Sequence, residues 1–434
     1  MLDNQCFVPL LASSPTTTAE RNARRKSPFL FLHMLSPGIL EFIWQHREDD
    51  PRQMALSGKK YPGLPMAELA SQVQALQKIR HKIPSWYRPG MYFPFPLSVE
   101  QASSEATAKF KAGLFEVDKM ADLTGGMGVD AGFFAQKAQS LTYVEQNAAL
   151  LEATRHNFQT LGIAGVDWYQ GTAESFLATH PGGLDLIYLD PARRHDAKGK
   201  VFQLADCTPD VLQLKTLLFQ KARRVLLKTA PLLDLKEAAR QLGQVAGIWV
   251  VAAQGECREV LYLLEPHTPS WENVPIQAVH LQEGGMAIFT FHWQEEQEAM
   301  AILSPPLQYL YEPNPAILKA GAFKSFGLRY GLGKLHTHTH LYTSAQLVEH
   351  VPARCFVVDQ ICRYDRKAVQ AAVPDGRANI TCRNFPDTPD QVRKKLGLKD
   401  GGEVYLFAAT VMEQQKVIVV GRKVEVTAGL AANV

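Results

Sequence analysis

The stretch "ADLTGGMGVDAGF", residues 121–133, decides the fold of this chain. An apolar run that ends at Leu123 passes into a turn that contains Gly125, Gly126 and Gly128, and a helical pattern follows. Glycines in such a turn let the backbone approach a ligand and let the helix pack closely on the strand. Because ligands of open α/β sheets bind outside the carboxyl ends of the strands, this turn is a candidate ligand site. Taken alone, it is also compatible with a tight strand-to-helix connection that binds nothing.

Residues 118–266 repeat this alternation of short apolar runs and helical patterns. Helical stretches separate the first five runs, "KMADLT", "LTYVEQ", "VDWYQG", "DLIYLD" and "RVLLKT". This order is typical of a parallel sheet that is covered by helices on both faces. The last two runs, "GIWVVAA" and "EVLYLLE", are joined only by "QGECR", which predicts an antiparallel pair at one edge of the sheet. The predicted fold class is therefore α/β, mostly parallel, with an antiparallel edge strand.

Segments of a different character flank this α/β region. "SPGILEFIWQH" places Ser36 as an N-cap and Pro37 at the first helical position, and a second helical pattern follows, so we expect an N-terminal helical domain. Beyond Pro266 strands and helices mix irregularly, which predicts C-terminal α+β modules. Residues 1–33 carry their basic residues after the first apolar piece, unlike a signal peptide. We interpret them as a flexible extension, with Met34 as a candidate natural first residue.

Composition restricts the class of protein only loosely. The chain has 434 residues and a formal net charge of +3, a mildly basic balance that permits a polyanionic partner without requiring one. It contains no run of about 18 apolar residues, so we expect no membrane-spanning helix. The six cysteines form no CxxC pair and are typical of reduced thiols in a cytoplasmic protein.

Polar residues recur where the predicted strands end. Glu145 ends the second strand, where a carboxylate can accept hydrogen bonds from both hydroxyls of a ribose. Thr172 and Ala173 follow the third strand, where a backbone N–H and a polar side chain would border an adenine ring. Asp190 and Pro191 end the fourth strand. A carboxylate at any one of these positions is more often merely solvated, but the ordered set favours a nucleoside ligand.

This ordered set resembles class I S-adenosylmethionine-dependent methyltransferases. Asp122, Gly126 and Gly128 match the first motif of that family, and Glu145 matches its ribose-binding acid. A dinucleotide-binding enzyme would carry a third glycine where this chain has Ala131. The resemblance implies S-adenosylmethionine as the cofactor, bound by Asp122, Thr124, Gly126, Gly128, Glu145, Thr172, Ala173 and Asp190.

A closer resemblance extends over residues 34–425. "SSEATAKFKA", "DLTGGMGVDAGFFA", "YLDPARR", "YEPNPAILKAGAF", "HLYTS" and "RNFPDTPDQVRKKLGL" are similar to a bacterial methyltransferase family with a ferredoxin-like insert and a THUMP-like C-terminal domain. The resemblance implies an RNA substrate, because THUMP domains generally bind RNA, chiefly tRNA. The expected organisation is a flexible extension (1–33), an N-terminal helical domain (34–95), a methyltransferase domain (96–270), a ferredoxin-like module (271–345) and a THUMP-like domain (346–434).

The segment "DPARR" carries the predicted chemistry. Asp190 and Pro191 match the start of the Asp/Asn-Pro-Pro-aromatic motif of enzymes that methylate exocyclic amines, a motif also similar to that of RNA guanine-N2 methyltransferases. Asp190 and the Pro191 carbonyl would accept the amine N–H groups; alternatively, Asp190 caps the following turn. The chain departs from the motif at Ala192 and at Arg193, which replaces the stacking aromatic. Arg193 can stack on a base or grip a phosphate, but it can equally pair with Asp196 or Asp206, and the role of Arg194 is open.

Basic residues near the C-terminus are candidates for RNA contacts. Arg383, Arg393, Lys394 and Lys395 lie in the THUMP-like region, where they suit a phosphate backbone, although a solvated helix face is the plain alternative. His336, His338 and His340 alternate as on one strand face; no acid or cysteine accompanies them, so a polar face is favoured and no structural metal is expected. Lys228, at the end of the fifth strand, either faces a phosphate or is solvated.

These observations predict an enzyme that transfers methyl groups from S-adenosylmethionine to RNA, either tRNA or rRNA. The expected acceptor is an exocyclic amine of a base, such as guanine N2. Two alternatives remain open from the sequence: a methyltransferase of a protein or small molecule, and a non-catalytic RNA-binding protein that has kept the sheet. Binding of the cofactor separates the last of these from the enzymes, and salt-sensitive binding to tRNA separates RNA from small substrates.

Overall fold

The computed structural model describes residues 34–193, 203–268 and 270–424, which form two compact units. The first unit comprises the residues up to 105 together with 147–164, and the second comprises 106–146 and the residues from 165 onward. The extension predicted at 1–33 lies outside the described residues. Among the described residues, no helix has both the length and the apolar character that a membrane span needs.

The first unit is helical, as its sequence predicts. Its longest helices are α5 (Met66–Lys82) and α9 (Ala148–Leu161), and the shorter ones are α3 (Pro37–Gln45), α4 (Pro51–Ala55), α6 (Pro96–Gln101) and the 3-10 turns η1 (Ser57–Lys59) and η2 (Pro84–Trp86). Ser36 precedes α3 with Pro37 in its first turn. The apolar positions of α5 are buried along one face, which explains its helical spacing.

Two buried amides hold the proline-rich segment of this unit. The side chain of Gln72 bonds both the N–H and the C=O of Phe93, at 2.9 and 2.7 Å. The side chain of Asn157 does the same for Tyr92, at 2.9 and 2.8 Å. The prolines prevent this segment from forming regular secondary structure. The two side-chain amides therefore supply the hydrogen bonds that its backbone N–H and C=O groups would otherwise make with a neighbouring strand.

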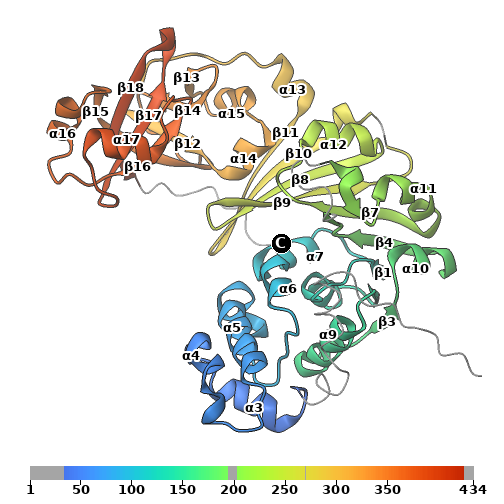
Figure 1. Cartoon of the computed structure of the whole chain (residues 1–434). Helices are drawn as coiled ribbons and strands as arrows, with labels where there is room; N and C mark the ends of the chain where they lie inside the picture. Colours follow the sequence, from blue (N-terminus) through green and yellow to red (C-terminus); the bar gives the residue numbers. More distant parts are fainter. Residues whose placement is uncertain (1–33, 194–202, 269, 425–434) are drawn as a thin grey trace, which may run out of the picture. The chain divides into compact units, whose positions relative to one another are not determined.

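The second unit is built on a nine-stranded sheet in the order β11-β10-β8-β9-β7-β4-β1-β2-β3 (Figure 1). The strands are β1 (Lys119–Asp122), β2 (Ser140–Glu145), β3 (Val166–Gln170), β4 (Leu184–Leu189), β7 (Ala222–Thr229), β8 (Val245–Ala253), β9 (Glu256–Leu264), β10 (Pro275–Gln282) and β11 (Gly285–His292). Strands β9 and β11 are antiparallel to their neighbours, and the other pairings are parallel. The predicted α/β class, mostly parallel with an antiparallel edge strand, is confirmed.

The β8–β9 pair differs from the prediction in its position. It is antiparallel, but β10 pairs in parallel with β8 and continues the sheet, so the antiparallel edge strand is β11. The physical reason is burial: from Gly247 to Ala253 every residue of β8 is buried, and a strand that lies inside a sheet can be apolar on both faces.

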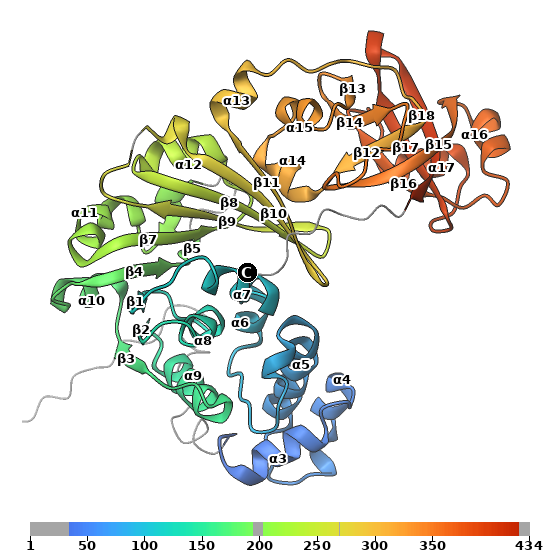
Figure 2. The same cartoon turned by 180° about the vertical axis from the view of Figure 1, so that it is seen from behind.

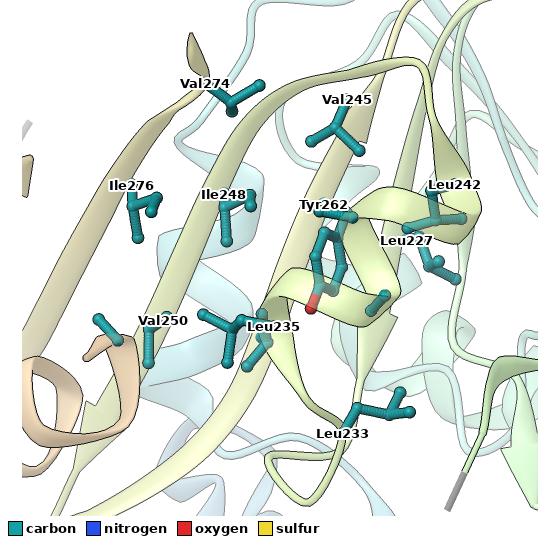
Figure 3. Close-up of a cluster of buried hydrophobic side chains, with 14 of the residues drawn as sticks. Leu227, Leu233, Leu235, Leu242, Val245, Ile248, Val250, Tyr262, Val274 and Ile276 are labelled. Atoms are coloured by element: carbon teal, nitrogen blue, oxygen red, sulfur yellow. The ribbon is translucent and has the colours of Figure 1, made fainter. Parts of the chain in front are cut away.

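Among the described residues of the second unit, four α-helices lie between strands of this sheet: α8 (Val129–Phe134), α10 (Ala173–Thr179), α11 (Val211–Lys221) and α12 (Leu235–Leu242). Helix α7 (Glu105–Ala112) precedes β1, and α13 (Trp293–Glu298) follows β11. Figure 3 shows the apolar side chains of β7, β8, β9 and β10 gathered with Leu235 and Leu242 of α12. Burial of this cluster fixes the sheet, and with it the strand ends that carry the candidate site.

A second sheet of seven strands follows in the order β13-β14-β12-β15-β18-β17-β16 (Figure 2). Its strands are β12 (Tyr309–Pro313), β13 (Gly333–His336), β14 (Thr339–Ser344), β15 (Ala353–Arg363), β16 (Asn379–Arg383), β17 (Val404–Thr410) and β18 (Lys416–Val424). Four helices belong to this part of the chain: α14 (Pro315–Ala320), α15 (Lys324–Arg329), α16 (Arg366–Ala372) and α17 (Pro389–Leu396). Of these, α14 packs on β8, β9 and β10 of the nine-stranded sheet. Helix α16 packs on β15 and α17 on β16, as both views show.

Candidate functional site

The glycine turn after β1 is shaped by two different requirements. A side chain at Gly125 would place its Cβ 2.3 Å from the ring of Tyr143, so this glycine is needed for packing against β2. Gly126 has a φ of +58°, which favours glycine, and a Cβ there would meet only the Thr124 carbonyl, at 3.6 Å. Gly128 also has a positive φ, +78°, where α8 begins. The backbone at Gly126 is therefore open to a ligand, whereas Gly125 serves the fold.

The turn is tied to the end of β2 by two hydrogen bonds. The N–H of Gly126 donates to the carboxylate of Glu145 at 2.9 Å, and the hydroxyl of Tyr143 donates to the Gly126 carbonyl at 2.6 Å. Glu145 is half-buried, so the acid expected to meet a ribose lies directly beside the glycine backbone.

Asp122 is buried beneath the turn. Its Oδ1 accepts hydrogen bonds from the N–H of Thr124 at 3.0 Å and from the hydroxyl of Thr124 at 3.4 Å. Burial raises the pKa of Asp122 to about 8, aided by the nearby carboxylates of Asp130 and Asp190 and opposed by the Thr124 N–H. Asp122 therefore holds the turn from below, and its proton is retained near neutral pH.

Thr172 and Ala173 stand where α10 begins. The hydroxyl of Thr172 accepts from the N–H of Ser175 at 3.2 Å, an N-cap, and Ala173 is buried. The N–H of Gly171 donates to the Glu145 carbonyl at 3.1 Å, which keeps this loop next to the tip of β2. The structure thus brings the predicted third-strand residues to the same end of the sheet as Glu145.

Asp190 lies at the end of β4, next to the glycine turn. Its backbone N–H donates to the Oγ1 atom of Thr124 at 2.7 Å. Its carboxylate, 37% exposed, accepts a hydrogen bond from Nζ of Lys228 at 2.5 Å. Lys228 is only 11% exposed, so the interpretation of this lysine as a solvated strand end is wrong. A contact of Lys228 with a phosphate stays a prediction.

Arg193 follows in an exposed position. It lies in the short strand β5 (Ala192–Arg193), which pairs with β6 (Cys207–Thr208), and Pro191 is half-buried before it. Asp206, one expected partner, uses its carboxylate to accept from the N–H of Gln203 at 3.2 Å. Arg194 and Asp196 lie outside the described residues.

Behind Asp190 and Lys228 lies a buried ionic network that the sequence did not reveal. Nζ of Lys111 bonds both carboxylate oxygens of Glu259, at 2.7 and 2.8 Å, and lies 3.2 Å from Oδ1 of Asp130. The hydroxyl of Tyr188 donates to Oδ2 of Asp130 at 2.7 Å, and Nζ of Lys228 lies 4.0 Å from that same oxygen. The only local hint is Glu259, a single acid within the apolar strand "EVLYLL".

The pKa values of this network follow from burial and from charge. Burial acts to lower the pKa of Lys228, but the carboxylates of Asp190 and Asp130 outweigh it, and the pKa is raised. Burial raises the pKa of Glu259 against the opposing effect of the Lys111 ammonium. Lys228 therefore carries a stable positive charge beside Asp190.

The residues at these strand ends fit a nucleoside cofactor such as S-adenosylmethionine. The backbone at Gly126 is open to close approach, and the half-buried carboxylate of Glu145 lies beside it, where it suits ribose hydroxyls. These residues would hold the nucleoside, while the exposed carboxylate of Asp190 would lie toward the acceptor.

The predicted RNA-binding residues fall into two pairs. Arg383 donates to buried Glu312 at 2.6 Å, and Arg393 contacts Asp390 and Asp400, both at 2.6 Å. Lys394 and Lys395 are exposed on α17, and Nζ of Lys395 lies 4.1 Å from the centre of the Tyr364 ring. Both arginines are therefore engaged in ion pairs of the C-terminal region. Nζ of Lys395 also lies 3.8 Å from Oδ2 of Asp387, but the two lysines are more exposed than the arginines.

The three histidines do not share a strand. His336 ends β13 and His340 belongs to β14, because the chain reverses at the turn that contains Thr337 and His338. The single polar strand face predicted for them is therefore wrong. The described residues contain no group of three or more His, Cys, Asp or Glu that could hold a metal ion.

Two parts of the chain match known domain families, and most of it resembles known proteins. Residues 309–352 match a ferredoxin-like domain family, and residues 353–423 match a THUMP domain-like family. The chain is 25% identical, over 305 residues, to uncharacterized S-adenosylmethionine-dependent methyltransferases from two strains of Mycobacterium tuberculosis, CDC 1551 and H37Rv; the alignment covers 70% of this chain and 80% of each relative.

A solved structure extends the comparison to most of the chain. The crystal structure of a "putative methyltransferase" from Porphyromonas gingivalis W83 is 33% identical, covers 89% of this chain and 98% of its own, and superposes with a TM-score of 0.80. The chain therefore belongs to the family of S-adenosylmethionine-dependent methyltransferases that carry a ferredoxin-like domain and a THUMP-like C-terminal domain.

Proposed function

We propose that this methyltransferase acts on RNA, at an exocyclic amine of a base such as guanine N2. The observation that carries the proposal is the carboxylate of Asp190, which is exposed at the end of β4 while its backbone is bonded to the glycine turn through Thr124. An acceptor that contacts Asp190 therefore lies at the strand ends proposed to hold the cofactor.

Methyl transfer from a sulfonium requires of the protein mainly that it align the acceptor with the methyl group. S-adenosylmethionine, when bound, supplies a methyl group on a positively charged sulfur. The acceptor nitrogen must point its lone pair along the line of transfer, and correct alignment of reactants supplies a large part of the acceleration. Asp190 and the Pro191 carbonyl accept one amine N–H each and so fix that direction. The proton that the methylated nitrogen loses passes to Asp190 and then to solvent.

Arg193 is the proposed contact to the acceptor beyond the amine. It is exposed, and it follows Asp190 by three positions, where amine methyltransferases carry a stacking aromatic. A planar guanidinium can stack on a base and can also bind a phosphate in two-pronged fashion. Either contact favours a nucleotide over a small apolar substrate.

The C-terminal region supports RNA as the class of substrate. Residues 353–423, which match the THUMP domain-like family, contain thirteen Lys and Arg against eight Asp and Glu. Lys394 and Lys395 are exposed there, and such cations bind a phosphate backbone through counterion release. We assign the RNA contact to these two lysines first, and to Arg383 and Arg393 only if their ion pairs open.

The test is transfer of labelled methyl groups to defined acceptors. Purified protein is incubated with S-adenosylmethionine that carries a tritiated methyl group and, separately, with tRNA, rRNA or protein from a strain that lacks the enzyme. We expect label in one RNA fraction and a loss of about 100-fold or more in Asp190→Ala, which removes the acceptor oxygen. Asp167→Ala, at an exposed carboxylate of β3, is the matched control and should keep full activity. Label in protein alone, or near-normal turnover in Asp190→Ala, would overturn the proposal.

A further inference from the structure

Lys228 stands between the exposed and the buried parts of the ionic network. Its ammonium donates to Asp190 at 2.5 Å on one side and lies 4.0 Å from Asp130 on the other. Its side chain is 11% exposed, whereas that of Asp190 is 37% exposed. Among the described residues, Asp190 therefore lies between this lysine and the proposed acceptor site.

Asp130 is in turn held from two directions. Tyr188 donates to its Oδ2 at 2.7 Å, and Lys111, whose side chain is wholly buried, lies 3.2 Å from its Oδ1. Lys111 also bonds both oxygens of Glu259. These residues come from α7, α8, β4 and β9, so the anchor is built from segments far apart in the chain.

Such an arrangement fixes a side chain that is ordinarily flexible. A lysine side chain loses rotamer entropy when it is immobilised, and here that entropy is already lost when the protein folds. A buried charge without a partner is strongly destabilising, so the partners on both sides define where the ammonium can rest. The position of Asp190 is consequently constrained by its Thr124 contact at the backbone and by Lys228 at the carboxylate.

We propose that Lys228 is a positioning residue that holds the carboxylate of Asp190 in one orientation, with Asp130 and Lys111 as its buried anchor. The inference rests on the proposed role of Asp190 toward the acceptor amine. Lys228 contacts neither cofactor nor acceptor in this account. Its effect is exerted on the alignment of the acceptor, and therefore on turnover.

The first test needs no RNA. The ammonium of Lys228 is followed by proton–nitrogen NMR of the full chain labelled at lysine Nζ, and its signal is assigned by its loss in Lys228→Met. Ion-paired, buried ammonium groups exchange their protons slowly, so we expect a resolved signal. Asp190→Asn should shift that signal strongly, whereas Asp167→Asn should leave it in place. An unchanged signal in Asp190→Asn would overturn the pairing, whatever the substrate is.

The second test separates positioning from binding. In Lys228→Met we expect kcat to fall by about 10- to 100-fold, because a small misplacement of an aligned group has effects of this size. The dissociation constant for S-adenosylhomocysteine, measured by calorimetry, should stay within about twofold. Lys228→Arg, which retains the charge, should recover much of kcat. Lys236→Met, at an exposed lysine of α12, should match the wild type.

The outcomes of these tests are distinct from those of the proposed function. Equal losses of kcat and of cofactor affinity in Lys228→Met would assign the lysine to the cofactor and overturn the inference. Normal kcat in a folded Lys228→Met would do the same. If Lys228→Met fails to fold, Lys228→Arg is measured instead. A folded Lys228→Arg that is as inactive as Asp190→Ala would contradict the claim that the charge at this position orients Asp190.

A different result would concern only the proposed function. If no RNA is methylated but the Lys228 ammonium signal still shifts in Asp190→Asn, the RNA substrate is rejected and the pairing of Lys228 with Asp190 stands.

Discussion

The backbone N–H of Asp190 donates to the side-chain oxygen of Thr124 at 2.7 Å, and so joins the tip of β4 to the glycine turn after β1. The same threonine hydroxyl lies 3.4 Å from Oδ1 of buried Asp122. The Thr124 side chain therefore fixes the position of the proposed acceptor residue, Asp190, relative to the glycine turn proposed to hold the cofactor.

Removal of the Thr124 hydroxyl should weaken both functions of the site together. Thr124→Val keeps the shape but leaves the Asp190 N–H and Asp122 with one partner fewer. A lost hydrogen bond of this kind is equivalent to about 1–1.5 kcal/mol, so cofactor affinity measured by calorimetry should fall about tenfold, with kcat reduced as well. Thr124→Ser, which keeps the hydroxyl, is the control. Unchanged affinity and kcat in Thr124→Val would show that this bond does not organise the site.

The two neighbouring glycines should respond to alanine in opposite ways. Gly125→Ala forces a methyl group against the ring of Tyr143, so the free energy of unfolding should fall by about 1–3 kcal/mol. Gly126→Ala places its methyl group in ordinary contact with the Thr124 carbonyl, at 3.6 Å, so the main effect on stability is about 1 kcal/mol of strain from the positive φ. In Gly126→Ala the larger effect should be on the affinity for the cofactor, which should fall by tenfold or more. Urea unfolding and calorimetry on both variants check the contrast, which fails if Gly126→Ala binds the cofactor normally.

The raised pKa of Asp122 predicts a specific pH dependence of stability. Its carboxyl ionises near 3.8 in the unfolded chain and near 8 in the folded chain. Between these values the folded state holds a proton that the unfolded state has lost, so the contribution of Asp122 to stability is complete below about pH 4 and declines as the pH rises to 8. The wild type should therefore lose stability relative to Asp122→Asn between pH 5 and pH 8, by at most about 1.4 kcal/mol per pH unit. Urea unfolding at several pH values tests this, and a constant difference would contradict the raised pKa.

The buried pair of Lys111 and Glu259 should matter far more to stability than an exposed pair. Lys111→Met leaves two buried carboxylates without their cation, an effect of about 3–5 kcal/mol. Arg422→Met breaks the exposed pair with Asp359, where solvent screens the charges, so it should lower the free energy of unfolding far less. Chemical unfolding of both variants provides the comparison. Similar losses in the two would mean that the network is not buried in solution.

The exposed lysines of α17 should control the salt dependence of RNA binding. Lys394→Gln with Lys395→Gln should weaken binding to tRNA or rRNA and reduce the slope of log affinity against log salt by about 1–2. Lys236→Gln, on α12 of the other sheet, is the charge-matched control. Affinity measured at several salt concentrations distinguishes the variants, and equal slopes would place the RNA elsewhere on the chain.

The sequence predicts those features that depend on local pattern. The glycine turn, the alternation of strands and helices, and the N-terminal helices with Ser36 and Pro37 at their start are all local, because each follows from neighbouring residues. The clustering of the polar residues at the strand ends is also predictable from the sequence, because parallel strands have their carboxyl ends at one edge of the sheet.

The features that the sequence does not predict depend on contacts between distant segments. Lys111 and Glu259 are 148 residues apart. Glu259 is an isolated acid in an apolar run, but nothing in the sequence indicates Lys111 as its partner. In the sequence Lys228 is an ordinary strand-end cation, and only the fold places Asp190 and Asp130 around it. Likewise, β10 pairs with β8, a contact between strands that are not consecutive in the chain. The apolar sequence of β8 does not by itself indicate which strand pairs with it on that side.

The central claim is that the enzyme methylates a base of RNA with the help of Asp190, and the most direct measurement is of the cell's own modified nucleosides. Total tRNA and rRNA from the wild type, a deletion strain, and deletion strains that express either the wild-type enzyme or Asp190→Ala are digested and compared by mass spectrometry. We predict that one methylated nucleoside, an N2-methylguanosine type, disappears on deletion and returns with the wild-type enzyme but not with Asp190→Ala. Unchanged levels of every methylated nucleoside in the deletion strain would contradict the account.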